Sequence, residues 1–300
     1  MTNIFRDYLR KFVEVFLDDF CVYSSKKEHM EKLGLTFEKC RASNLRLHLE
    51  KSYICMEEGI LLGHRISCRG IEVDKEKVAI IVELNPPCCV QDVQAFLDST
   101  GYYRRFVWKY VERASLLVQL LKKDISWKWR ATQQKAFEDL KLQLVKAPVL
   151  IAPNWERPFH VYVDTSAFVI GVVLSQQDEK KHDHPIYFSG KKLTDAERKF
   201  STTEREALGM VFLVKKFRHY LLGYEIIFHV DDYSLKYLVK KADLSGIIAQ
   251  WVLLLQEFNI TIEWRHGSQH ANADFLSRLQ QEHGGEHTKV GDWEFSDENL

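Results

Sequence analysis

Four acidic residues in the C-terminal half of the sequence have types and positions that suit metal-dependent hydrolysis. Asp164 ends an alternating run of apolar and polar residues, Glu204 lies near a helix start, Asp231 follows a second apolar run, and Asp274 lies in a last helical segment. Mg²⁺ prefers oxygen ligands, and two such ions about 4 Å apart relieve charge on the attacking water and the leaving oxygen of a phosphodiester. Each acid alone also has a structural interpretation, because an aspartate at a strand end commonly caps a turn. The spacing is compatible with a two-metal site and does not by itself exclude that alternative.

The elements that must position these acids alternate between strands and helices from residue 151 onward. Apolar or alternating runs predict strands over 158–164, 168–174, 185–189, 226–230 and 259–264. Thr203 and Glu206 have capping-box spacing, which would place Glu204 in the first turn of the following helix. This order of elements predicts an α/β module in which helices flank a mixed five-stranded sheet.

Two adjacent acids, Asp18 and Asp19, lie between apolar runs near the start of the sequence. The runs over 12–17 and 20–23 predict a β-hairpin with the two acids at its tip. Adjacent acids are common in turns, so the pair alone does not indicate a site. A further hairpin is expected over 53–66, with its turn at 57–59.

The segment between these two parts is basic and helical in pattern. Helices are predicted over 75–84, 90–100, 102–121 and 128–145. Residues 101–147 contain eleven Lys or Arg and four Asp or Glu. Such a segment could face phosphate, although a solvated helix face has the same composition. Trp108 could stack on nucleic acid, but at helical spacing core packing is at least as good an interpretation.

Composition limits the class of protein. The length of 300 residues fits about two domains, and a hydrophobic share of 46% is enough for packed cores. The sequence has 42 Lys or Arg and 42 Asp or Glu, so its net charge does not indicate a particular kind of partner. All six cysteines precede residue 90, without CxxC pairing or a secretory signal before them, which predicts reduced thiols and an intracellular, cytoplasmic or nuclear, location rather than secretion. No apolar run reaches membrane-spanning length, so no membrane partner is expected.

The second half resembles the RNase H domain of gypsy-type LTR retrotransposon polyproteins. The resemblance is carried by four blocks in order: Asp164-Thr165-Ser166, TTEREAL at 202–208, KFRHYLLG at 216–223 and ADFLSR at 273–278. It implies that Asp164, Glu204, Asp231 and Asp274 bind two Mg²⁺ ions, for which Mn²⁺ could substitute. It also implies that the substrate is an RNA–DNA hybrid, of which the RNA strand is cut.

The first half resembles the reverse transcriptase of the same polyproteins. The segment over 16–19 is similar to the hairpin in which two aspartates, here Asp18 and Asp19, bind catalytic metal. Residues 62–64 are similar to the segment that positions the primer end, and residues 101–106 to the thumb-like and connection region. The nucleic-acid-binding residues implied by this resemblance are Gly63, His64, Tyr103, Arg104, Arg105 and Trp108.

The two resemblances imply an organisation of the whole chain. The C-terminal part of a reverse-transcriptase palm would occupy 1–70, a thumb-like and connection helical region 71–150, an RNase H-like domain 151–280, and a disordered acidic tail 281–300. The expected fold class is therefore α/β, or α+β across several domains.

Some departures from the family pattern bear on activity. The family's polymerase needs a further aspartate and the fingers, well upstream of the hairpin, and seventeen residues precede Asp18. We therefore expect no DNA synthesis by this chain alone, although the missing N-terminal half could act in trans. Asp98 stands where the family usually has Gly, which puts thumb packing in doubt. Asp232 and His266 replace the usual His and Pro.

These observations predict a Mg²⁺-dependent endonuclease that cuts the RNA strand of RNA–DNA hybrids. The alternative is a decayed or co-opted fragment that binds nucleic acid without cutting it. The four acids favour the enzyme, whereas the substitutions at Asp98 and Asp232 and the absent polymerase segment favour the fragment. The sequence does not determine the oligomeric state.

Overall fold

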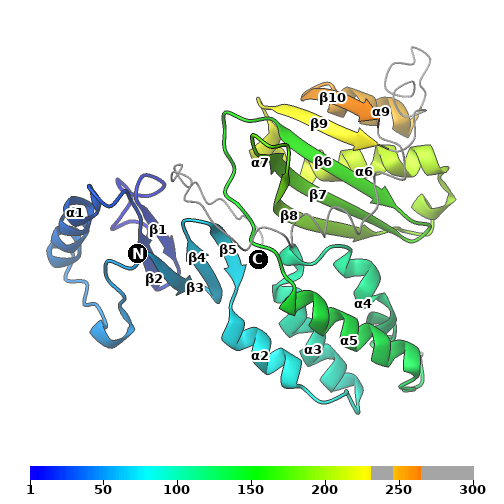
Figure 1. Ribbon diagram of the computed structural model, residues 1–300, viewed down its shortest axis with the longest axis horizontal. Helices are drawn as coiled ribbons and strands as arrows, with labels where there is room; N and C mark the ends of the chain where they lie inside the picture. Colours follow the sequence, from blue (N-terminus) through cyan, green and yellow to red (C-terminus); the bar gives the residue numbers. More distant parts are fainter. Residues whose placement is uncertain (124, 231–245, 265–300) are drawn as a thin grey trace. The chain divides into compact units, whose positions relative to one another are not determined.

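The computed structural model describes residues 1–123, 125–230 and 246–264 (Figure 1). The chain divides into two compact units, of which the first covers Met1–Gly70 and the second begins at Ile71. The predictions for Asp231, Asp232, His266, Asp274 and the acidic tail lie outside the described residues. The six cysteines are all free thiols. Within the described ranges, no helix combines the length and apolar character needed to span a membrane.

The first unit opens with the expected hairpin. Its first elements are β1 (Val13–Phe16), β2 (Asp19–Val22), α1 (His29–Ala42) and the 3-10 turn η1 (Leu49–Lys51). The strands β1 and β2 are antiparallel, and Phe16 pairs with Asp19. This register leaves Leu17 and Asp18 as a two-residue turn, so the predicted hairpin is confirmed, with Asp18 in the turn and Asp19 as the first residue of β2.

Two short strands follow in this unit, β3 (Glu58–Leu61) and β4 (His64–Ser67), which pair antiparallel. Leu61 pairs with His64, so the turn lies at Leu62-Gly63 and the prediction of a turn at 57–59 is wrong. Both turn residues are left-handed, with φ of 48° and 66°. A tight hairpin turn with two left-handed residues matches the twist of its strands, and Gly63 adopts this conformation without steric cost. The apolar Leu62 concealed the turn in the sequence.

The second unit begins within the strand β5 (Gly70–Val73), which a helical region follows. The elements of this region are α2 (Lys75–Glu83), α3 (Val90–Tyr102), the 3-10 turn η2 (Arg104–Phe106), α4 (Tyr110–Gln119) and α5 (Ala131–Val145). Phe96, Phe137 and Leu140 are almost fully buried in its core. Asp98 lies on the exposed side of α3, where its carboxylate accepts a hydrogen bond from Gln94 Nε2 at 2.7 Å. The departure at Asp98 therefore does not disturb the packing of this region.

A five-stranded sheet follows the helical region. It is formed by β6 (Phe159–Thr165), β7 (Val169–Gln177), β8 (Asp183–Lys192), β9 (Glu225–Val230) and β10 (Asn259–Trp264), in the order β10-β9-β6-β7-β8. Neighbours are antiparallel across β6-β7-β8, whereas β9 is parallel to both β6 and β10. The helical elements here are η3 (Glu197–Lys199), α6 (Thr202–Lys216), α7 (Arg218–Leu221) and α9 (Ile247–Leu255). The prediction of a mixed five-stranded sheet with flanking helices is confirmed.

The two faces of this sheet pack against different parts of the chain. Val161 and Val172 belong to the core that α6 covers (Figure 1). Val173 and Phe188, on the opposite face, belong to the core of the helical region and meet Trp108 there. The helical region and the sheet, which the sequence predicted as separate domains, therefore lie in one compact unit.

Candidate active site

The strand β6 places Asp164 near its C-terminal end, on the face that the helical region covers. Phe159, Val161 and Val163 point into the core beneath α6, so the strand's alternation directs Asp164 the other way. Its side chain is 36% exposed, and Oδ2 lies 2.6 Å from the Nζ atom of Lys109. The carboxylate is thus accessible and already carries a cationic partner.

The neighbouring strand β9 ends at the same edge of the sheet. It runs parallel to β6, and the last paired residues are Tyr162 and His229. Beyond Val230, where β9 ends, the next residue in the sequence is Asp231, which lies outside the described residues. Because the carboxyl ends of parallel neighbours share one edge, the end of β9 and the end of β6 that carries Asp164 lie close together.

The start of α6 uses Glu204 as a helix cap. Ser201 is the N-cap, and its hydroxyl accepts a hydrogen bond from Glu204 N at 3.3 Å. In return, Glu204 Oε2 accepts one from Ser201 N at 2.8 Å. Glu204 lies in the first turn as expected, but the predicted box of Thr203 and Glu206 is wrong by two residues. Serine is the better N-cap, and the box it forms occupies the Glu204 carboxylate.

A second glutamate of α6, Glu206, points toward the sheet. It is only 5% exposed and lies one helical turn before Gly209, where an added Cβ would come within 2.4 Å of Val163 Cγ1. Arg205 Nη1 donates to Ser166 O at 3.2 Å, so this turn of α6 is joined to the turn that follows β6. The sequence analysis missed Glu206 by assigning it to the cap. Met210 and Leu213 follow Glu206 at helical spacing and are buried. This spacing could have indicated that Glu206 lies on the buried face of the helix.

The capping box gives a stability prediction. Ser201→Ala should lower the free energy of unfolding by about 1 kcal/mol, because the Glu204 N–H at the helix start loses its acceptor. Ser201→Asn, which keeps an acceptor at the N-cap, is the matched control and should change it by less than about 0.5 kcal/mol. Urea unfolding followed by tryptophan fluorescence measures both. Equal effects of the two substitutions would contradict the assignment of the cap.

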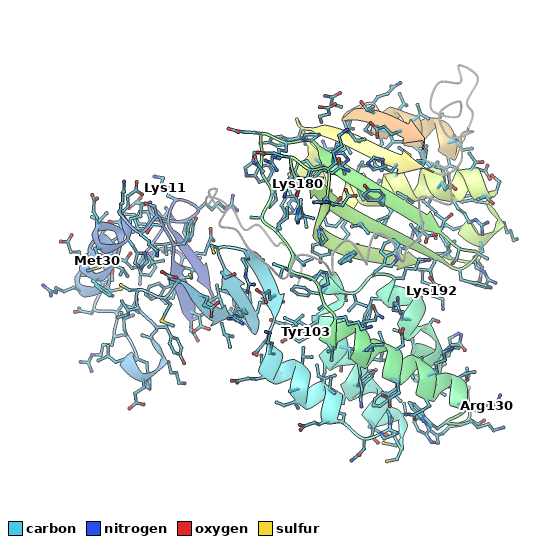
Figure 2. All side chains as sticks on the ribbon, viewed as in Figure 1. Lys11, Met30, Tyr103, Arg130, Lys180 and Lys192 are labelled. Carbon is cyan, nitrogen blue, oxygen red and sulfur yellow. The ribbon has the colours of Figure 1, made fainter. Side chains whose placement is uncertain are left out.

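Two of the predicted nucleic-acid-binding side chains lie in the core. Tyr103, which is labelled in Figure 2, is 1% exposed, and Trp108 is 6% exposed, so neither is placed to stack on a base. Burial raises the pKa of Tyr103 to about 12. Arg104 is exposed, whereas the Arg105 guanidinium lies over the Tyr187 ring at 5.4 Å. Arg104 is therefore the residue of this segment best placed to meet a phosphate.

The residues predicted from the polymerase resemblance lie in the first unit. Asp18 and Asp19 are exposed at their hairpin. Gly63 is buried in the turn before β4, and His64 Nδ1 lies 3.0 Å from Leu62 O. Over residues 1–123, 125–230 and 246–264, no third metal-ligating side chain joins Asp18 and Asp19 in a compact group.

One compact group of ligand-type side chains does occur in the described ranges, at the start of α3. It consists of Cys88, Cys89 and Asp92, whose ligand atoms all lie within 4.8 Å of one another. Asp92 accepts hydrogen bonds from the Cys88 backbone N–H at 2.9 Å and from its thiol at 3.0 Å. These bonds lower the pKa of Asp92 to about 2 and raise that of the Cys88 thiol. They join Asp92, in the first turn of α3, to the residue before the N-cap Cys89.

The mixed five-stranded sheet, with α6 over one face and Asp164 near the end of its central strand, has the arrangement of an RNase H-like domain. Residues 129–228 match the family described as the RNase H-like domain found in reverse transcriptase. The chain is 34% identical over 284 residues to the retrovirus-related Pol polyprotein from transposon 297 of Drosophila melanogaster, covering 94% of the chain and 26% of the relative. It is 30% identical to that from transposon opus of the same organism, covering 92% and 29%. A transposon Tf2-3 polyprotein of Schizosaccharomyces pombe is 29% identical, with 90% and 21% covered.

Solved structures share the fold. The foamy viral protease-reverse transcriptase dRH in complex with double-stranded DNA superposes with a TM-score of 0.75 at 21% identity, covering 88% of this chain and 47% of that one. The complex of the foamy viral enzyme with an RNA/DNA hybrid gives 0.72 at 19% identity, covering 100% and 39%.

The chain is a homologue of gypsy-type retrotransposon Pol polyproteins and carries their RNase H-like domain. It spans about a quarter of the length of the curated relatives it matches. The family resemblance found in the sequence is thus confirmed.

Proposed function

We propose that this chain is a metal-dependent endonuclease that cuts the RNA strand of RNA–DNA hybrids. The main support is the position of Asp164, an accessible carboxylate near the end of the central strand of an RNase H-like domain. The ammonium of Lys109 forms an ion pair with it. The parallel strand β9 ends beside it, immediately before Asp231 in the sequence. Phosphodiester hydrolysis by two metal ions needs several carboxylates from different elements at one place.

The donor set fits a hard divalent cation. The proposed ligands are carboxylates, the oxygen donors that Mg²⁺ and Mn²⁺ favour. The Lys109 Nζ atom lies 2.6 Å from Asp164 Oδ2. Its positive charge marks a place beside the carboxylate where a metal ion could bind instead. We propose Asp164, Asp231, Asp274 and one glutamate of α6 as the ligands of two Mg²⁺ ions. Of the two glutamates, Glu206 faces the sheet, whereas Glu204 caps the helix.

Each residue would have a separate task in hydrolysis. The two ions, when bound, would lower the pKa of a water molecule and stabilise charge on the leaving 3′ oxygen. Asp164 would fix the position of the phosphodiester relative to the sheet edge. Glu206, held by the packing of α6 on β6, would orient the attacking water. The exposed Arg104 would bind a backbone phosphate of the hybrid.

The proposed partner is the RNA–DNA hybrid itself. This proposal draws support from the foamy viral relatives of known structure, which were solved with double-stranded DNA and with an RNA/DNA hybrid. We further propose that Asp18 and Asp19 support DNA synthesis only together with the remainder of a reverse-transcriptase palm and its fingers. Large apolar side chains exposed in the first unit, among them Met30, Leu49 and Tyr53, would suit contact with those parts.

The test is a cleavage assay on the purified chain. A hybrid labelled on each strand in turn should lose its RNA strand only, in the presence of Mg²⁺ or Mn²⁺ and not with a chelator. Asp231→Asn should remove cleavage while the far-ultraviolet circular dichroism stays unchanged. Folded protein that binds the hybrid but never cuts it would support the alternative of a non-enzymatic fragment. Cleavage by Asp231→Asn at the unaltered rate would contradict the site.

A further inference from the structure

A row of one carboxylate and two glycines crosses three strands of the sheet. Asp164 of β6 pairs with Gly171 of β7, and Gly171 pairs with Gly190 of β8. Residues directly opposite one another in antiparallel strands point to the same face. The two glycines therefore leave the sheet uncovered beside Asp164, on the face that the helical region packs against.

The segment that leads into α4 fills this row. Trp108 and Lys109 lie 3.3 and 3.4 Å from the place where a Cβ at Gly171 would be. Val111 lies 3.4 Å from the corresponding place at Gly190, where a Cβ would also meet Ile170 O at 3.1 Å. Larger residues at the two glycine positions would push this segment off the sheet. The close approach brings the helical region to the carboxylate of Asp164.

Lys109 is the residue of the segment that reaches the acid. It directly precedes α4 with φ 54° and ψ 34°, a left-handed conformation that costs free energy for a residue with a side chain. In this conformation its Nζ atom lies 2.6 Å from Asp164 Oδ2 and 3.7 Å from Glu112 Oε2. The helical region thus supplies a positive charge to the site on the sheet.

We propose that Lys109 is a positioning residue of the nuclease site, which holds Asp164 in the metal-free protein and transfers to a phosphate of the hybrid when Asp164 binds a divalent ion. This inference rests on the proposed function. A divalent ion bound to Asp164 would repel an ammonium held at contact distance by the same carboxylate, so metal binding favours displacement of the ammonium. The displaced ammonium remains tethered beside the place where the phosphodiester is cut. Metal binding and hybrid binding would then favour each other.

The first test measures metal binding without substrate, by Mn²⁺ titration followed by electron paramagnetic resonance. Lys109→Asn removes the charge and tolerates the left-handed backbone, and Lys109→Met keeps the length of the side chain. An ion pair at a partly exposed position is worth up to a factor of about five, so both variants should bind Mn²⁺ about fivefold more tightly than the wild type. Lys109→Arg should bind it as the wild type does.

The matched control is Lys191→Met, which removes a similarly exposed ion pair with Glu197 from the same unit. It should leave Mn²⁺ binding unchanged. A second readout is the kinetic constants at saturating Mn²⁺. Loss of a phosphate contact in the Lys109 variants should appear mainly in KM for the hybrid, with an increase of about fivefold.

The outcomes separate this inference from the proposed function. In one outcome, Asp164→Asn abolishes Mn²⁺ binding, but neither Lys109→Asn nor Lys109→Met tightens it. That result overturns the role of Lys109 and leaves the nuclease site standing. Tightening by only one of the two variants also overturns it, because the effect would then come from the backbone or the stem rather than from the charge. Mn²⁺ binding that is indifferent to Asp164→Asn overturns both proposals.

Discussion

Glu206→Gln is expected to lower kcat for hybrid cleavage by about a thousandfold or more, since metal-assisted stabilisation of the transition state is worth several kcal/mol. Glutamine has nearly the same volume but lacks the negative charge that a metal ion or an oriented water requires. The side chain is almost fully buried on the sheet-facing side of α6. Burying a carboxylate costs free energy unless a cation or hydrogen bonds compensate its charge. Single-turnover cleavage of a labelled hybrid at saturating Mg²⁺ gives the rate directly.

Glu204→Gln is the matched control, two residues away on the same helix. Its carboxylate accepts a hydrogen bond from Ser201 N, and glutamine can still do so through its carbonyl oxygen. We expect kcat within about fivefold of the wild type, equivalent to about 1 kcal/mol. The reverse result, with Glu204→Gln inactive and Glu206→Gln active, would restore Glu204 as the metal ligand and leave Glu206 with a structural role.

The strands were predictable because their signal is local. In β6 the alternation of Phe159, Val161 and Val163 with polar residues fixes both the strand and the face on which Asp164 lies. The continuous apolar run of β7, followed by helices before β9, is then enough to predict a mixed sheet. The resemblance to polyproteins then supplied the family, since four blocks in order are far more specific than single acids.

The sequence could not predict how distant residues meet. Nothing in the spacing of Lys109 and Asp164 indicates that they form an ion pair, because the contact depends on the register that aligns Gly171 and Gly190 beside the acid. Competition between two possible N-caps also made one prediction wrong. Ser201 and Thr203 both have a glutamate three residues later, and only the structure decides that Ser201 precedes α6 and forms the box.

The ion pair of Lys109 and the start of α6, which the sequence did not predict correctly, both lie near the end of β6 that carries Asp164. The helical region contributes the cation there, and α6 contributes a buried glutamate and the Arg205 contact to the turn after β6. The site is therefore assembled by packing between elements. Its integrity depends on small residues that let the elements approach, of which Gly209 is the most constrained.

Gly209→Ala is expected to lower the free energy of unfolding by about 1–3 kcal/mol, the usual cost of adding a methyl group to a well-packed core. An added Cβ would lie 2.4 Å from Val163 Cγ1 and 3.3 Å from Ile170 Cγ2. Val163 is β-branched, buried and adjacent to Asp164, so it cannot rotate away without moving the strand that carries the acid. Hybrid cleavage should fall together with stability.

The matched control for Gly209→Ala is Gly34→Ala, in helix α1, where an added Cβ meets nothing within 4 Å. There the better helix propensity of alanine should raise stability by about 0.5–1 kcal/mol. Six of the seven tryptophans lie between residues 108 and 264, so fluorescence during urea unfolding mainly reports the second unit, and circular dichroism at 222 nm reports both units. The same substitution, glycine to alanine, would then lower the free energy of unfolding at Gly209 and raise it at Gly34. Stabilisation at Gly209 would mean that α6 does not press on β6, and that Glu206 is not held against the site.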